Sequence, residues 1–198
     1  MTLSIHIKDR RKILIVIAVL CLCHNLYANE VLTIEGLSFP LNSFNNRKDF
    51  KELSQRSLDG FGAYRRAGHK HAGLDIYANF SEKVLSIGKG KVKAIYGEFP
   101  YKTVIIEHET QNNKIVYSAY THVEDIQVSI EQKVDVTTII GRAFSEEEFK
   151  KSEFYANHIH LEIRKSMERY KGISIRCYSI DDLNKYFYDP SAVFKNGL

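Results

Sequence analysis

The 198-residue chain has no tryptophan, only three prolines and only three cysteines. Two of the cysteines, Cys21 and Cys23, lie near the N-terminus, which leaves Cys177 alone in the rest of the chain. A single cysteine cannot form an internal disulfide, so a disulfide-stapled fold is excluded and Cys177 is expected to be a buried structural thiol on a strand. The sequence has no internal repeat, and 44% of its residues are hydrophobic. This composition predicts a domain with a packed core rather than a disordered chain.

The chain also has little excess of either positive or negative charge. The formal net charge is +4, but residues 1–28 contain four of the basic residues and one of the acidic residues. The remainder is nearly neutral and has no long basic run. Proteins that bind nucleic acids normally present a concentrated basic surface. We therefore expect no nucleic-acid partner.

The N-terminus has the pattern of an export signal. A basic cluster at residues 8–12 precedes a purely apolar run at residues 13–23. The run is too short to cross a bilayer comfortably, because about 20 residues are needed. It fits the apolar region of a secretory signal, with cleavage after Ala28. We expect residues 1–28 to be a signal peptide and the mature protein to reside in the periplasm or cell envelope. An uncleaved membrane tether is the alternative.

Short β-like segments dominate the chain after residue 60. They carry β-branched or aromatic residues, several in alternation, and glycines or asparagines separate them. The expected strands are residues 83–87, 91–96, 103–108, 114–121 and 157–164, with a further strand pair within 128–141. Short helices are expected at 49–56, at 145–154 and after Ser179, which can cap a helix. The pattern predicts a mainly β, antiparallel fold with short helical inserts.

Two local patterns place metal-binding side chains together. His71 and Asp75 are four residues apart, and Gly73 between them permits a close backbone approach. His158 and His160 share one face of the expected strand, because side chains alternate with a period of two. Two histidines and one carboxylate suit zinc and leave one coordination position open for water. An isolated histidine is more often a surface or core residue, so spacing alone leaves both interpretations open.

In their order, the motifs resemble those of the lysostaphin-like (LytM) zinc metallopeptidases, family M23. The resemblance covers residues 60–193 and rests on four segments: residues 68–76, 104–108, 120–122 and 157–164. It implies an antiparallel β-sheet core of lysostaphin type. The implied peptidase domain is residues 60–198, preceded by an N-terminal segment at residues 29–59.

The resemblance also implies roles for five residues. His71, Asp75 and His160 match the family's zinc ligands, while His122 and His158 match its two unligated catalytic histidines. Zn²⁺ would polarise the scissile carbonyl and activate water. His158 would act as general base and His122 would stabilise the oxyanion, or the two would share these tasks. The implied substrate is the peptide part of peptidoglycan.

Residues near these motifs carry weaker expectations. We expect His69 to be a loop residue or substrate contact, His108 to be structural, and Glu162 to point away from the metal. The segment before His158 departs from the family in being acidic and lysine-rich, and Glu131 stands where the family usually has glycine. Four further side chains either line the cleft or pack in the core: Tyr64, Arg65, Tyr77 and Tyr120.

Three functions follow from the sequence. The favoured one is an exported zinc endopeptidase that hydrolyses peptidoglycan stems or cross-links, because all five site residues are present. The alternatives are a non-catalytic LytM-type regulator of another cell-wall hydrolase and a peptidase with a protein substrate. Some relatives block the metal with an upstream asparagine, so Asn42, Asn45 or Asn46 is a hypothetical latency residue. Oligomeric state is not predicted.

Overall fold

The computed structural model describes residues 32–167 and 176–197. The predicted signal peptide and its alternative, a membrane tether, lie outside the described residues. Within the described part of the chain, no helix has the length and apolar character needed to cross a membrane.

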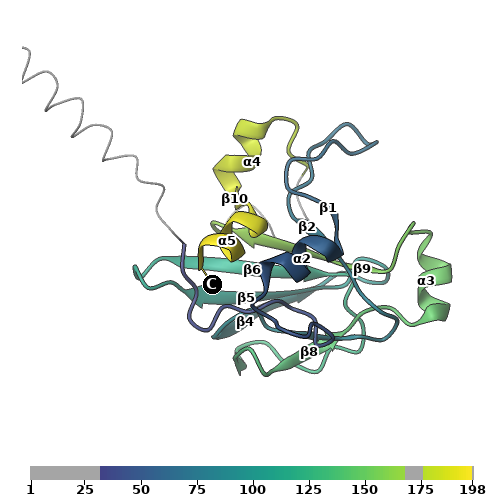
Figure 1. Ribbon diagram of the computed structural model, residues 1–198, viewed down its shortest axis with the longest axis horizontal. Helices are drawn as coiled ribbons and strands as arrows, with labels where there is room; N and C mark the ends of the chain where they lie inside the picture. Colours follow the sequence, from purple (N-terminus) through teal and green to yellow (C-terminus); the bar gives the residue numbers. More distant parts are fainter. Residues whose placement is uncertain (1–31, 168–175, 198) are drawn as a thin grey trace, which may run out of the picture. The chain divides into compact units, whose positions relative to one another are not determined.

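An antiparallel sheet forms the centre of the described unit (Figure 1). Its strand order is β1-β2-β9-β6-β5-β4-β7, and β10 pairs with the C-terminal end of β9. These strands are β1 (Ser57–Asp59), β2 (Leu74–Tyr77), β4 (Gly90–Tyr96), β5 (Thr103–Glu109), β6 (Ile115–Thr121), β7 (Lys133–Val134), β9 (His158–Arg164) and β10 (Phe187–Tyr188). A smaller sheet pairs β3 (Lys83–Leu85) with β8 (Ile139–Arg142). The prediction of a mainly β, antiparallel fold is confirmed.

Short helices flank the sheet, and their first residues explain where they begin. Asp49 caps α2 (Phe50–Arg56), and Ser179 caps α4 (Ile180–Tyr186) by accepting a hydrogen bond from the Asp182 amide. Ser145 and Glu148 form a reciprocal capping box at the start of α3 (Glu146–Ser152). No sequence pattern predicted the last helix, α5 (Pro190–Gly197).

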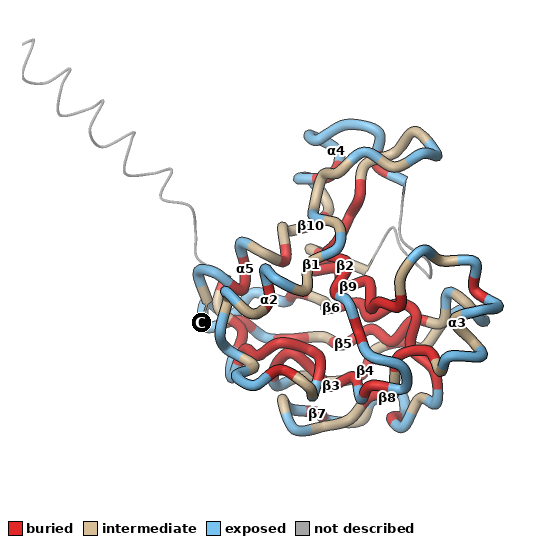
Figure 2. The backbone as a smooth tube through the Cα atoms, turned by 45° about the vertical axis from the view of Figure 1, so that its right-hand side comes forward, coloured by how far each residue is buried: buried red, intermediate tan, exposed pale blue. Residues whose placement is uncertain are grey.

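One face of the sheet carries the main core. Ile159, Leu161 and Ile163 of β9 belong to this core, as their alternation predicted. Residues 32–44 and helices α2 and α5 supply its other side, and Figures 1 and 2 show these segments against buried strands. Among the side chains that they bury are Ile34, Phe39, Leu41, Leu53 and Phe194. The segment that precedes residue 60 therefore shares one core with the predicted peptidase domain.

The expected strand pair within residues 128–141 is wrong in its pairing. Both strands exist, but β7 pairs with β4 and β8 pairs with β3. Glu131 lies in the turn before β7 and adopts a left-handed φ of 70°. Glycine reaches this conformation without steric cost, which accounts for the glycine that the family usually has at this position. The Glu131 carboxylate lies 2.9 Å from the Lys91 ammonium, a contact that a glycine would lack.

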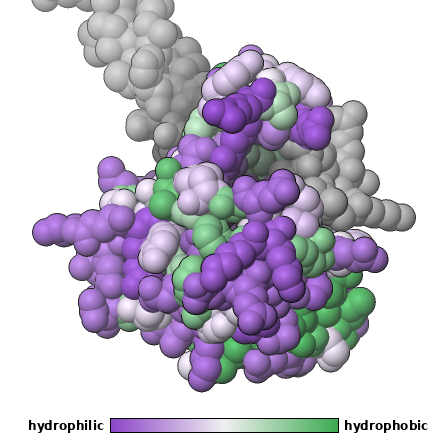
Figure 3. Space-filling model, turned by 90° about the vertical axis from the view of Figure 1, so that its right-hand side faces the viewer, coloured by the Kyte–Doolittle hydropathy of each residue, from purple (hydrophilic) through white to green (hydrophobic). Residues whose placement is uncertain are grey.

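The surface near α3 is mixed in character. Figure 3 views the molecule from this side and shows a mostly hydrophilic surface with an apolar area at its lower edge. Large hydrophobic side chains that are exposed in this structure include Phe80, Phe99, Tyr101, Ile130 and Tyr155. Two of them, Tyr101 and Tyr155, lie next to the histidines described below.

Candidate metal centre

The predicted metal ligands come together on the sheet face opposite the main core. Asp75 of β2 lies directly opposite His160 of β9, and His160 lies opposite Thr121 of β6. His71 enters from the segment just before β2. Gly73 lets this segment approach β9, because a Cβ at this position would lie 2.4 Å from the Leu161 carbonyl oxygen and 2.8 Å from His160 Cε1. The close approach expected of Gly73 is thus a property of the fold.

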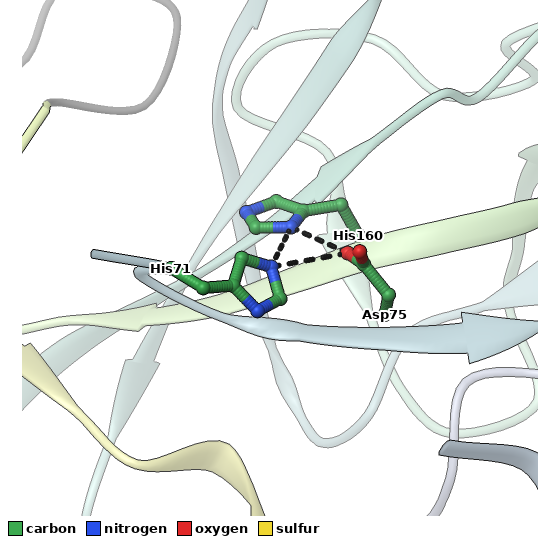
Figure 4. Close-up of side chains that lie close together, drawn as sticks. All are labelled: His71, Asp75 and His160. Atoms are coloured by element: carbon green, nitrogen blue, oxygen red, sulfur yellow. Dashed lines mark hydrogen bonds and ion pairs between the residues drawn. The ribbon is translucent and has the colours of Figure 1, made fainter. Parts of the chain in front are cut away.

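The three side chains form a compact, buried cluster (Figure 4). One ligand atom from each of His71, Asp75 and His160 lies within 4.8 Å of the other two. His71 Nε2 is 2.9 Å from His160 Nδ1, and Asp75 Oδ1 is 3.1 Å and 2.8 Å from these two nitrogens. Two imidazole nitrogens and one carboxylate oxygen therefore face a common point, which is a donor set typical of zinc.

The outward nitrogen of each imidazole is bound to an acceptor. His71 Nδ1 donates to the Gly60 carbonyl oxygen at 2.9 Å, and His160 Nε2 donates to Glu162 Oε1 at 3.0 Å. These contacts place a proton on the outward nitrogens and direct the inward nitrogens at the cluster, as outer partners do in metal sites. Glu162 in turn accepts from Arg164 Nε at 2.7 Å. The residues present therefore fit a zinc ion.

Electrostatics at the cluster favour a positive charge. Burial alone would raise the pKa of Asp75, but hydrogen bonds from His160 and His71 outweigh it and hold that pKa far below its usual range. Burial alone would lower the pKa of His160, whereas Asp75 and Glu162 raise it to about 9. Two carboxylates flanking one imidazole therefore stabilise a cation at this place, whether a proton or a metal ion.

The other two predicted site residues lie beside the cluster. The ring centroids of His122 and His158 are 4.8 Å apart, and His158 Nε2 is 3.9 Å from Asp75 Oδ2. His122 follows β6 with a left-handed φ of 70°, an uncommon conformation that is often found at functional sites. His122 Nδ1 donates to the Pro100 carbonyl oxygen at 2.7 Å, and His158 Nδ1 donates to that of Ala156 at 2.8 Å. Both histidines therefore present Nε2 as a proton acceptor.

Burial keeps these two imidazoles neutral. Desolvation, followed by the nearby His158, lowers the pKa of His122 to about 3. Desolvation also lowers the pKa of His158, although Asp75 opposes this effect. At neutral pH each Nε2 therefore carries a lone pair rather than a proton.

Aromatic side chains enclose both histidines, a feature that the sequence patterns did not reveal. The Phe154 ring centroid lies 4.6 Å from that of His122 and 5.4 Å from that of His158. Tyr101 packs beside His122, and Tyr155 stacks on His158 with an interplanar angle of 25°. Phe154 and Tyr155 follow α3, within the segment whose composition departs from the family. This segment therefore borders the candidate site directly.

A cleft of about 500 Å³ opens beside the cluster. It reaches three of the predicted site residues, His71, His122 and His160. His69 also lines it from a loop, in agreement with the expectation of a loop residue, and its contact with substrate stays a prediction. The remaining lining is Arg65, Ala67, Lys70, Ala72, Tyr101, Thr121 and Arg176.

Two expectations about other residues are wrong. Glu162 does not point away from the cluster, because residues two apart on a strand share a face and its carboxylate contacts His160. The proposed latency asparagines bond elsewhere: Asn42 Oδ1 accepts from the Lys83 amide, and the amides of Asn45 and Asn46 donate to Glu52. In the described structure none of these asparagines contacts the metal-binding cluster.

The structural expectations hold for His108, Tyr120 and the buried Cys177, whereas Tyr64 and Tyr77 neither pack in the core nor line the cleft. His108 is fully buried, with Nδ1 2.8 Å from the Lys89 carbonyl oxygen and Nε2 2.7 Å from Ser118 Oγ. Tyr120 is a core residue, whereas Tyr64 and Tyr77 are exposed. Cys177 is buried and pairs with Lys70 across an isolated β-bridge.

Comparisons with known proteins agree with this geometry. The model of peptidase family M23 matches residues 69–173. The catalytic domain of lysostaphin from Staphylococcus simulans, an antimicrobial peptidase, superposes with a TM-score of 0.51 at 20% identity, covering 75% of this chain and 98% of that domain. A longer lysostaphin structure gives 0.50 at 19% identity, covering 70% of this chain and 49% of that one. The chain thus spans about half the length of the longer protein. No curated protein sequence matches. These likenesses confirm the predicted sheet type.

Proposed function

The chain belongs to peptidase family M23, and we propose that it is an exported, zinc-dependent endopeptidase that hydrolyses the peptides of peptidoglycan. The observation that carries this proposal is the buried cluster of His71, Asp75 and His160 with His122 and His158 beside it. The cluster supplies the donor atoms for a metal ion, and the imidazoles of His122 and His158 supply the groups that would transfer protons. His71 and His160 of the cluster and His122 of the pair line one cleft.

His71 Nε2, Asp75 Oδ1 and His160 Nδ1 would hold the zinc ion. When bound, zinc acts as a Lewis acid on the scissile carbonyl and lowers the pKa of bound water to about 7. His158 Nε2 would accept the proton of the attacking water, because burial keeps it unprotonated at neutral pH. It would then deliver this proton to the leaving amine.

The ring centroid of His122 lies 4.8 Å from that of His158, and His122 Nε2 is also unprotonated at rest. It could stabilise the oxyanion only while it holds a proton, so we propose that the two histidines share the tasks of base and donor, and that the one proton taken from water stays on one of them until it passes to the leaving amine. The aromatic residues around them exclude water and strengthen these interactions.

Export and substrate class rest on other arguments. The basic and apolar pattern of residues 1–28 supports a signal peptide. The resemblance to lysostaphin-like enzymes supports the peptides of peptidoglycan as substrate. A periplasmic or envelope location would bring enzyme and substrate together, and a retained membrane tether would serve the same end.

The test is mass spectrometry of fragments that residues 29–198, loaded with zinc, release from purified peptidoglycan. His160→Ala removes one donor and serves as the metal-site control. New peptide termini that only the wild-type protein generates would establish an endopeptidase and identify the bond that is cut. If a zinc-bound, folded wild type leaves peptidoglycan intact, a parallel digestion of unfolded casein separates the two alternatives. Cleavage of casein indicates a peptidase for proteins, and its absence indicates a non-catalytic regulator.

A further inference from the structure

Arg65 links two carboxylates on neighbouring strands, one of which is the candidate metal ligand. Its two terminal nitrogens lie 2.6 Å from Asp75 Oδ2 and 2.9 Å from Asp59 Oδ2. Asp59 and Asp75 face each other across β1 and β2, where two like charges would repel. The guanidinium between them removes that repulsion and ties Asp75 to the edge of the sheet.

The backbone holds Arg65 in place for this contact. The Arg65 amide donates to the His69 carbonyl oxygen at 2.9 Å, and the Gly68 amide donates back to the Arg65 carbonyl oxygen at 2.9 Å. Gly68 has a φ of 80°, which closes this turn at a position where other residues would be strained. Arg65 therefore reaches Asp75 from a fixed turn rather than from a free surface position.

Because of the contact with Arg65, the two oxygens of Asp75 have different partners. Oδ2 is taken by Arg65, and only Oδ1 faces the inward nitrogens of His71 and His160. Oδ2 is also 3.9 Å from His158 Nε2. A carboxylate without Arg65 would be free to turn this oxygen toward the metal position or toward His158.

We propose that Arg65 is a positioning residue that makes Asp75 a one-oxygen metal ligand and keeps its second oxygen away from His158. The proposal rests on the zinc site of the proposed function. The planar fork of arginine contacts two carboxylates at once, which the single ammonium of lysine does with less geometric control. The position of Asp75 thus depends on a residue that is not itself a metal donor.

The experiment measures the zinc affinity of the purified protein by competition with a chelating dye. The variants are Arg65→Gln, Arg65→Lys and Asp59→Asn, and the matched control is Arg66→Gln, which removes the adjacent, exposed arginine. We expect Arg65→Gln to bind zinc about 10- to 100-fold more weakly, the range found for outer partners of metal ligands. Arg65→Lys should restore part of this loss, Asp59→Asn should cause a smaller loss, and Arg66→Gln should match the wild type.

A second readout separates positioning from general damage. In the cobalt-substituted protein, visible absorption is stronger for four-coordinate than for five-coordinate ions. If Arg65→Gln lets Asp75 bind through both oxygens, its cobalt spectrum weakens, while near-ultraviolet circular dichroism of the metal-free protein stays unchanged. A variant that is merely unfolded would lose the circular dichroism signal as well, and Arg65→Lys then provides the comparison.

Zinc affinity and a cobalt spectrum equal to those of the wild type in Arg65→Gln and Arg65→Lys would overturn the proposal. Peptidoglycan cleavage by the wild type is assayed alongside. A wild type that binds zinc but cleaves nothing contradicts the proposed function, while a weakened Arg65→Gln site still supports the positioning role. A wild type that cleaves while Arg65→Gln keeps full zinc affinity contradicts only the role of Arg65.

Discussion

His122 and His158 differ from the three ligand residues in what holds them. Each donates Nδ1–H to a backbone carbonyl and packs against Phe154, so neither depends on the metal-binding cluster for its orientation.

Replacing either His122 or His158 by alanine should lower kcat about 10²- to 10⁴-fold, the usual contribution of a general acid or base. Zinc content should stay at one ion per chain. Atomic absorption and peptidoglycan digestion check this together, with Gln111→Ala, an exposed residue in the turn after β5, as the control. Loss of zinc in these variants would contradict the assignment.

The burial of His108, away from the site, predicts that the protein loses stability in acid. Burial lowers the pKa of His108 to about 4, although the hydrogen bond to the Lys89 carbonyl opposes this. In the unfolded chain the pKa of His108 is near 6.5, so the unfolded state binds the proton more readily than the folded state. The stability that neutral His108 supports is therefore fully present above pH 6.5 and is lost as pH falls towards 4. The free energy of unfolding should fall by about 3 kcal/mol at most through this group.

Urea unfolding between pH 7 and pH 4 measures this effect. His108→Gln cannot titrate and should show a flatter dependence on pH over this range than the wild type. Equal slopes in the two proteins would show that other groups carry the acid sensitivity.

The five predicted site residues lie in short local motifs, and these motifs with the family resemblance pointed to the residues that the structure brings together. The sequence missed Arg65 as a partner of Asp75, since Asp59, Arg65 and Asp75 come together only when β1 pairs with β2. It misplaced Glu162 although the strand period of two puts that residue on the same face as His160.

Among the structural elements, β2 and β9 bring the ligands together, and their spacing depends on Gly73. An alanine there would press its Cβ against the Leu161 carbonyl oxygen and the His160 ring. Backbone atoms cannot rotate out of the way, so β9 or the segment before β2 must shift. We expect Gly73→Ala to destabilise the fold by about 1–3 kcal/mol and to weaken zinc binding.

Thermal melting and dye competition report these two effects. Gly60→Ala is the matched control, because no atom lies within 4 Å of the position of its Cβ. A Gly73→Ala protein with the zinc affinity of the Gly60→Ala protein would show that the close approach is not needed.

Strands with alternating residues were predictable, and β4, β5, β6 and β9 lie near their expected bounds. The elements that were missed are the short strands β1, β2 and β10 and the C-terminal helix α5. A strand of two to four residues has too few side chains to show a period. The partners of β7 and β8 were also missed, because pairing between distant segments leaves no mark in local sequence.

For the whole molecule, the N-terminal segment is part of the fold. Residues 32–44 bury several large side chains against the sheet, including Ile34, Phe39 and Leu41. Removing one such side chain costs about 2–5 kcal/mol, and a domain of this size is stable by only about 5–15 kcal/mol. A chain that begins at residue 60 should therefore fail to fold, while residues 32–198 should fold. Near-ultraviolet circular dichroism and solubility compare the two proteins, and a cooperative melt of the shorter chain would contradict this expectation.

Strand β9 is buried along its whole length and is bonded to β2, β6 and β10. Its amides should consequently exchange with deuterium only when the entire domain opens, and they should be the slowest in the protein. Because the metal donors Asp75 and His160 belong to the paired strands β2 and β9, partial opening of the outer loops would leave these two donors together. Zinc release and global unfolding should then follow one transition, so that a zinc indicator added during denaturation would count unfolded molecules.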